Sequence, residues 1–218
     1  MHCPLALADS VKTSWEFLTK GGVFMIPLGI TAFVGVAAIL FKFLSLSRQR
    51  VIPDELALKV SRYEELVALD QTDTVEREVD QGNSTLSRLV SVALRHKGKP
   101  QGDIILAVEA SAREETSRLH AGIGVLDIVI TVAPLLGLLG TASGLVTIFD
   151  GLSDSADYMA IALGIAKALN TTILGLAIAV LCVVAHGYFT RRIEVFTARL
   201  EALLAELANA CQSKPDAE

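Results

Sequence analysis

Three long stretches of this sequence contain no lysine, arginine, aspartate or glutamate. They are residues 21–41, 128–149 and 168–190, which hold 21, 22 and 23 residues. The 19 Lys and Arg residues and the 24 Asp and Glu residues all lie elsewhere. A bilayer core is about 30 Å thick, so an α-helix needs about 20 apolar residues to cross it. Each stretch therefore predicts a transmembrane helix. This segregation of charge excludes a soluble globular enzyme, a disordered tail and a secreted disulfide scaffold.

The rest of the composition excludes further classes of protein. The formal net charge is −5, and no basic cluster carries interleaved aromatic residues, which argues against binding to nucleic acid. The cysteines Cys3, Cys182 and Cys211 show no CxxC spacing, so neither a disulfide framework nor a zinc site is indicated. We find no nucleophile–base pair and no phosphate-binding loop, and therefore expect neither an enzyme nor a bound cofactor.

Charges near the ends of the three stretches predict their orientation. Cations follow the first and third stretches at Lys42, Arg48, Arg50, Arg191 and Arg192. The connection between the second and third stretches carries the aspartates Asp150, Asp154 and Asp157. Because cationic flanks favour the cytoplasmic side of a membrane, we expect the N-terminus outside and the C-terminus in the cytoplasm.

The segments outside these stretches show helical periodicity. Pro53-Asp54-Glu55 is typical of a helix start, and Ser84 can cap a helix that ends at residues 98–100. From Asp103 the pattern continues into the second stretch without a strong breaker, which predicts one helix over residues 103–149. Beyond Arg192, apolar residues recur at intervals of three and four, at Ile193, Phe196, Leu200, Leu203, Leu207 and Ala210. This narrow seam predicts coiled-coil-like packing in a helical bundle.

We therefore predict an all-α membrane protein with three transmembrane helices, of which the second and third extend into a cytoplasmic helical bundle. The first expected segment, residues 1–20, lies outside and is either a short interfacial helix or a frayed end. The remaining expected segments are transmembrane helix 1 (21–46), a cytoplasmic helical loop (47–120), transmembrane helix 2 (121–149), an outer hairpin (150–163), transmembrane helix 3 (164–190) and a cytoplasmic C-terminal helix (191–218).

Small residues form one face on each of the last two spans. They are Gly137, Gly140, Thr141 and Gly144 on one, and Gly164, Ala168, Thr171, Thr172, Gly175 and Ala179 on the other. Such faces let helix backbones approach closely in lipid. We expect spans two and three to pack tightly, within one chain or between copies, and on spacing alone ordinary helix packing is the simpler explanation. Pro134 frees the Ile130 carbonyl, either at a pore or only at a packing kink.

The polar residues inside the spans are few. Thr141 and Thr172 are expected at comparable depth, although a membrane threonine usually bonds its own helix backbone. His186 has no second histidine spaced to pair with it, so we interpret it as an interface residue rather than a haem ligand. No carboxylate lies in the three stretches, and Asp127 lies only at the inner end of the second. Because membrane proton relays usually use Asp, Glu or His, a partner must supply the acid if this chain moves protons.

Three segments together resemble a known family. They are residues 133–144 (APLLGLLGTASG), 164–172 (GIAKALNTT) and 175–180 (GLAIAV). These segments resemble the TolQ/ExbB/MotA proton-channel family, and the TolQ/ExbB branch most closely. Flagellar stators of the MotA type have a fourth span, which is missing here.

The resemblance implies a homopentamer in the bacterial inner membrane, with the outer side facing the periplasm. Spans two and three would line a pore around the membrane helices of an ExbD/TolR-like partner, whose single aspartate carries protons. A TonB/TolA-like protein would receive the work. Thr141 and Thr172 match the family threonines that face this aspartate, and Pro134 matches the family proline.

The resemblance also implies that Lys167, Asn170 and Thr171 line the proton path. At Lys167 the family often carries a glutamate, so this lysine either snorkels to the outer headgroups or pairs with a partner carboxylate. ExbB-like energised uptake is the preferred function. The alternatives are a TolQ-like motor for envelope maintenance, a motility motor, a sodium-coupled variant and a nonconducting oligomeric scaffold.

Overall fold

The structure is a computed structural model that describes residues 23–69, 71–150 and 158–211. These residues form helices and no strand. In chain order the helices are α2 (Met25–Ser45), α3 (Arg48–Val51), α4 (Asp54–Ser61), α5 (Tyr63–Ala68), α6 (Asp73–Gln81), α7 (Thr85–Arg95), α8 (Gln101–His120), α9 (Ile123–Asp150) and α10 (Tyr158–Cys211). The all-α prediction is confirmed. The predicted N-terminal segment 1–20 lies outside the described residues.

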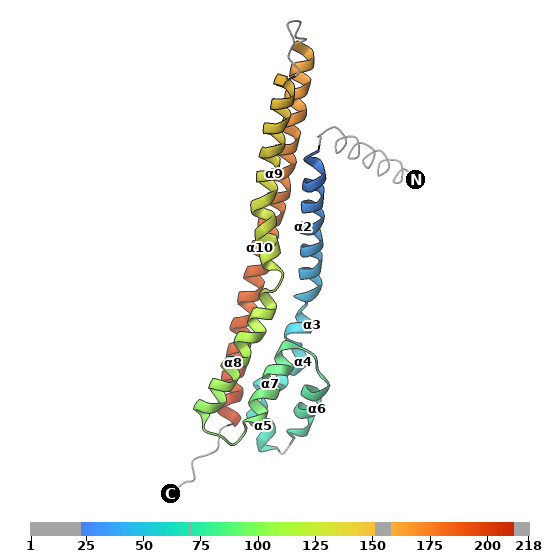
Figure 1. Ribbon diagram of the computed structural model, residues 1–218. Coiled ribbons are helices and arrows are strands. Elements are labelled where there is room, and N and C mark those ends of the chain that lie inside the picture. Colours follow the sequence, from blue (N-terminus) through green and yellow to red (C-terminus); the bar gives the residue numbers. More distant parts are fainter. Residues whose placement is uncertain (1–22, 70, 151–157, 212–218) are drawn as a thin grey trace, which may run out of the picture. The chain divides into compact units, whose positions relative to one another are not determined.

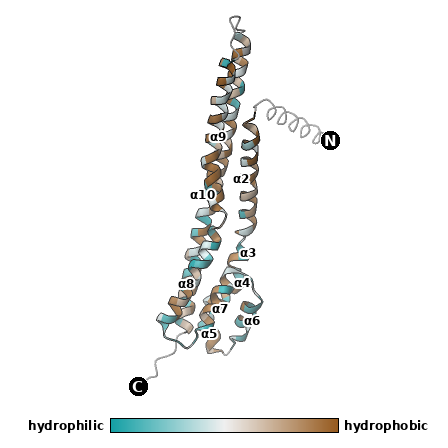
Figure 2. Cartoon of the chain, in the orientation of Figure 1, coloured by the Kyte–Doolittle hydropathy of each residue, from teal (hydrophilic) through white to brown (hydrophobic). Residues whose placement is uncertain are grey.

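The chain divides into two compact units, which we call the apolar unit and the polar unit. The apolar unit contains the described residues 23–40, 123–150 and 158–186, and the polar unit contains 41–69, 71–122 and 187–211. Helices α2 and α10 contribute to both. Figure 2 shows apolar residues concentrated on α2, α9 and the middle of α10, and hydrophilic residues on α6 and α8.

In the apolar unit, α9 and α10 run side by side, and α2 adds a third helix (Figure 1). Met25 and Leu28 of α2 are buried with Ala133 of α9, and Leu174 and Ile178 of α10 pack against them. Most of the remaining apolar side chains are exposed, including Phe33 at 74%. Such an apolar exterior is typical of a surface that lipid or another protein covers. Within the part of the chain that the structure describes, three helical segments have the length and hydropathy to cross a membrane, as predicted.

In the polar unit, the short helices bury one apolar face each. Helix α4 begins directly after Pro53, and the hydroxyl of Ser84 accepts the backbone N–H of Ser87 at 3.0 Å, so both predicted helix starts are confirmed. The seam predicted beyond Arg192 is also confirmed, because its first five members are buried: Ile193, Phe196, Leu200, Leu203 and Leu207.

The expected uninterrupted helix over residues 103–149 is wrong. Helix α8 ends at His120 and α9 begins at Ile123, because Ala121 is extended (φ −51°, ψ 132°) and Gly122 has φ +85°. The ammonium of Lys42, buried at 1% exposure, donates to the Leu119 carbonyl at 2.7 Å. A cation at this helix C-terminus satisfies a carbonyl that the break leaves without a helical partner.

Candidate functional site

The helices α9 and α10 meet along their small residues. A Cβ added at Gly137 would lie 2.9 Å from the Thr171 carbonyl oxygen, and one added at Gly140 would lie 2.7 Å from Thr171 Oγ1. A Cβ at Gly144 would lie 2.8 Å from the Ala168 Cβ. These distances are shorter than an added Cβ tolerates. At Gly137 the nearest atom belongs to the backbone of α10, whereas at Gly140 and Gly144 it belongs to a side chain, so α9 and α10 approach each other closely along this seam. The sequence left open whether this packing occurs within or between copies, and the structure places it within one chain.

Thr141 and Thr172 meet across this seam. Their hydroxyl oxygens are hydrogen-bonded to each other, and either can be the donor. Each also reaches the Gly137 carbonyl oxygen, at 3.1 Å from Thr141 and 3.0 Å from Thr172. Both side chains are half-buried. The structure thus brings together two hydroxyls that the sequence placed only at comparable depth.

Thr171 has a different setting from its neighbour Thr172. Its side chain is 1% exposed, and its hydroxyl donates to the Ala168 carbonyl at 2.8 Å or to that of Gly137 at 3.1 Å. Thr171 therefore lies inside the helix seam, where it holds α10 against α9.

The other residues expected along the proton path lie at the edges of this site. Pro134 is half-buried within α9, and the carbonyl oxygen of the preceding residue, Ala133, would lie 2.5 Å from a Cβ added at Gly175. Lys167 is exposed and Asn170 is half-buried on α10. Neither side chain makes a hydrogen bond or ion pair with another described residue.

One polar pair of the apolar unit was missed from the sequence. His186 Nε2 lies 3.0 Å from Asp127 Oδ1, which joins α10 to α9. Each residue was considered on its own helix, so neither indicated the other. The signal that could have found the pair is its spacing from the two threonines, because Asp127 precedes Thr141 by 14 residues and His186 follows Thr172 by 14.

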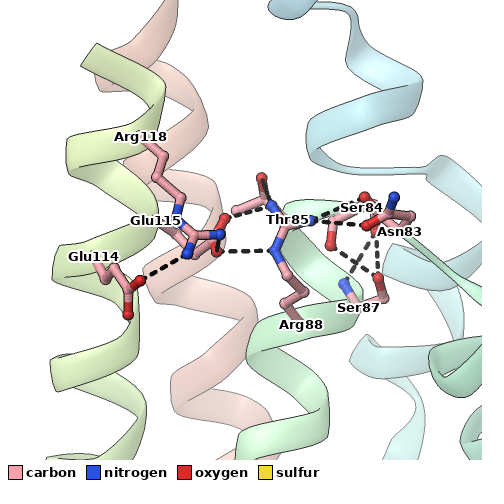
Figure 3. Close-up of polar contacts among 8 residues, drawn as sticks. All are labelled: Asn83, Ser84, Thr85, Ser87, Arg88, Glu114, Glu115 and Arg118. Atoms are coloured by element: carbon pink, nitrogen blue, oxygen red, sulfur yellow. Dashed lines mark hydrogen bonds and ion pairs between the residues drawn. The ribbon is translucent and has the colours of Figure 1, made fainter. Parts of the chain in front are cut away.

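A charged cluster ties α7 to α8 in the polar unit (Figure 3). The Arg88 guanidinium donates two hydrogen bonds to the Glu115 carboxylate, at 2.5 and 2.8 Å. Arg118 donates to the same carboxylate at 3.4 Å. Arg88 also donates to the Asn83 carbonyl at 3.0 Å. The hydrogen bonds that the Arg88 guanidinium donates to the Glu115 carboxylate raise the pKa of Arg88. The charges of this cluster pair with one another, so the cluster links α7 to α8 within the unit. Among the described residues, no group of three His, Cys, Asp or Glu side chains is placed to hold a metal ion.

Comparison with known proteins identifies the family. Residues 79–202, more than half of the chain, match the MotA/TolQ/ExbB proton channel family. A biopolymer transport protein ExbB homolog from Methanothermobacter thermautotrophicus is 37% identical over 61% of this chain and 47% of its own length. The ExbB-like 1 protein from Synechocystis is 34% identical over 81% of this chain and 70% of its own length. The Tol-Pal system protein TolQ from Pseudomonas aeruginosa is 34% identical over 43% of this chain and 41% of its own.

The family match covers the seam and both threonines. The chain spans about half the length of the first of these relatives. The family match and the three apolar helices together indicate a multi-pass membrane protein. The chain belongs to the MotA/TolQ/ExbB proton channel family, and within it to the ExbB/TolQ branch.

Proposed function

We propose that this chain is the channel subunit of an ExbB/TolQ-type motor in the bacterial inner membrane, which uses proton flow to drive energised uptake across the outer membrane. The observation that carries the proposal is the pair of contacting hydroxyls, Thr141 and Thr172, on two adjacent membrane helices. Family membership supports the channel role in general, and the relatives named ExbB favour uptake over the other processes.

In the proposed assembly, α9 and α10 of each copy surround the membrane helices of an ExbD/TolR-like partner. Five copies form the ring, the N-terminus lies in the periplasm and the polar unit lies in the cytoplasm. A carboxylate is costly inside a bilayer unless it is hydrogen-bonded. The two hydroxyls meet this need, because a hydroxyl can donate to an ionised carboxylate and accept from a protonated one.

The Gly137 carbonyl gives the hydroxyl pair an alternative partner. With no carboxylate nearby, both hydroxyls are satisfied by each other and by this carbonyl. When the partner's carboxylate arrives, a hydroxyl can rotate toward it while the carbonyl retains its helical N–H. The pair therefore accommodates both states of a proton carrier without leaving a buried polar group unpaired.

The test replaces each hydroxyl with a methyl group of the same shape. We expect Thr141→Val and Thr172→Val each to abolish energised transport, because each should stop the proton flow that drives it. The measurement is proton flux into proteoliposomes that hold the complex co-purified with its partner. Oligomer size, measured by native mass spectrometry, should not change. Thr147→Val is the matched control, since the Thr147 hydroxyl donates only to Ser143 of its own helix, at 3.0 Å.

The competing function is a nonconducting scaffold, which the close helix packing alone would also serve. A scaffold needs the glycine seam but neither hydroxyl. Full proton flux in both threonine variants would therefore reject the proposed channel site. The branch is tested separately by the co-purified third component, because a TonB-like protein favours uptake and a TolA-like protein favours envelope maintenance.

A further inference from the structure

Asp127 and His186 lie on the same face of the α9–α10 pair as the two threonines, about four helical turns further along. Fourteen residues span two heptads, which complete nearly four turns of α-helix and rise about 21 Å. Asp127 lies 14 residues before Thr141 on α9, and His186 lies 14 residues after Thr172 on α10. Because the two helices run antiparallel, both steps lead in the same direction. The carboxylate–imidazole pair therefore lies on the face of the helix pair that carries the hydroxyl pair.

The surroundings of this pair set it apart from the other ionisable groups. In the described part of the apolar unit, α2 contributes no titratable side chain, and α9 and α10 contribute four others: Asp150, Tyr158, Lys167 and Cys182. The first three lie on the opposite side of the threonine level along their helices. Cys182 is one turn from His186, but it is 1% exposed and packs where a Cβ at Gly35 would lie 2.9 Å from its sulfur.

Both members of the pair are accessible. The side chain of His186 is 31% exposed and that of Asp127 is 59% exposed. A partly exposed contact between a carboxylate and an imidazole contributes little to stability, so a stabilising role alone does not account for these two side chains at this position. Asp, Glu and His are the side chains that carry protons through membrane proteins.

We propose that Asp127 and His186 form a proton relay at the inner end of the path. This rests on the proposed function, since it takes the threonine face as the pore. A proton that leaves the threonine level binds a ring nitrogen of neutral His186. The resulting imidazolium donates through Nε2–H to the ionised Asp127. Loss of one proton from the imidazolium to cytoplasmic water restores the starting state, so each cycle moves one proton and consumes nothing else.

The test uses His186→Gln and Asp127→Asn in the complex co-purified with its partner. We expect proton flux, read from a pH-sensitive dye inside proteoliposomes, to fall about 100-fold in each, the lower end of what a positioned proton carrier contributes. The residual flux should lose its dependence on pH between about pH 5 and 8, where histidine changes charge. His120→Gln is the matched control, because His120 is an exposed histidine on α8. The exchanged pair, Asp127→His with His186→Asp, should restore flux.

The possible outcomes separate this inference from the proposed function. Normal flux and pH dependence in His186→Gln and Asp127→Asn, with flux lost in the threonine variants, would overturn the relay and leave the channel in place. Normal flux in all four variants would overturn both. Loss of flux that the exchanged pair does not restore, with an unchanged pH profile, would show a structural contact and also overturn the relay.

Discussion

At the scale of single residues, the polar side chains of this chain divide according to what they contact. Thr171 is buried in the helix seam, whereas Thr172, its neighbour, shares its hydroxyl with Thr141 at the edge of the seam. Sequence spacing identified all three threonines but not this division, because a difference of one residue rotates a helical side chain by about 100°. Asp127 and His186 were not paired from the sequence for a related reason, since their contact depends on the register of two helices.

Glu115 is the residue whose loss of a partner should be most costly in the polar unit. Its side chain is 8% exposed, and Arg88 supplies its two shortest hydrogen bonds. We expect Arg88→Ala to lower the free energy of unfolding by about 1–2 kcal/mol, below the usual cost of breaking a buried pair, because solvent screens the half-exposed Arg88. Denaturant titration of the purified protein measures this. Arg113→Ala removes an exposed pair at 3.9 Å and should change little. Equal losses in the two variants would contradict this role for Arg88.

At the scale of elements, the charge-free stretches predicted the three membrane helices because a bilayer imposes both their length and their lack of charge. The break between α8 and α9 could not be predicted in the same way. A single glycine costs an α-helix only about 1 kcal/mol, and the break also depends on Lys42, which reaches the Leu119 carbonyl from 77 residues away in the sequence. A tertiary contact of this kind leaves no local pattern.

The glycine seam makes a second prediction at this scale. An alanine at Gly175 would place its Cβ 2.5 Å from the Ala133 carbonyl oxygen, and backbone cannot move aside as a side chain can. We expect Gly175→Ala to destabilise the purified protein by about 1–3 kcal/mol, as overpacking typically does, and to separate α9 from α10. Gly124→Ala is the matched control on α9, since its Cβ would meet no atom within 4 Å. Detergent denaturation followed by circular dichroism compares the two, and a stable Gly175→Ala protein would refute direct backbone contact.

At the scale of the whole molecule, the chain combines an apolar unit suited to lipid with a polar unit suited to water. Helix α10 contributes to both without interruption over its 54 residues. Its sequence changes character along its length, from small residues that pack in lipid to the heptad seam from Ile193 to Leu207 that packs in water. These two patterns could be recognised from the sequence because helices pack through small residues in lipid and through heptad-spaced apolar residues in water. The threonine and carboxylate–imidazole sites needed the structure because they depend on pairing between helices.

The proposed orientation gives the last prediction. It places the C-terminal end of α9 on the periplasmic side of the membrane and the polar unit on the cytoplasmic side. Asp150, at the end of α9, and Asp73, at the start of α6, are both exposed. In a Cys3→Ser background, a membrane-impermeant maleimide added to spheroplasts should label Asp150→Cys at once and Asp73→Cys only after permeabilisation. Cys182 and Cys211 are buried and should contribute little background. The reverse order of labelling would contradict the proposed orientation. Asp127 and His186 would then lie at the entrance of the proton path instead of its exit.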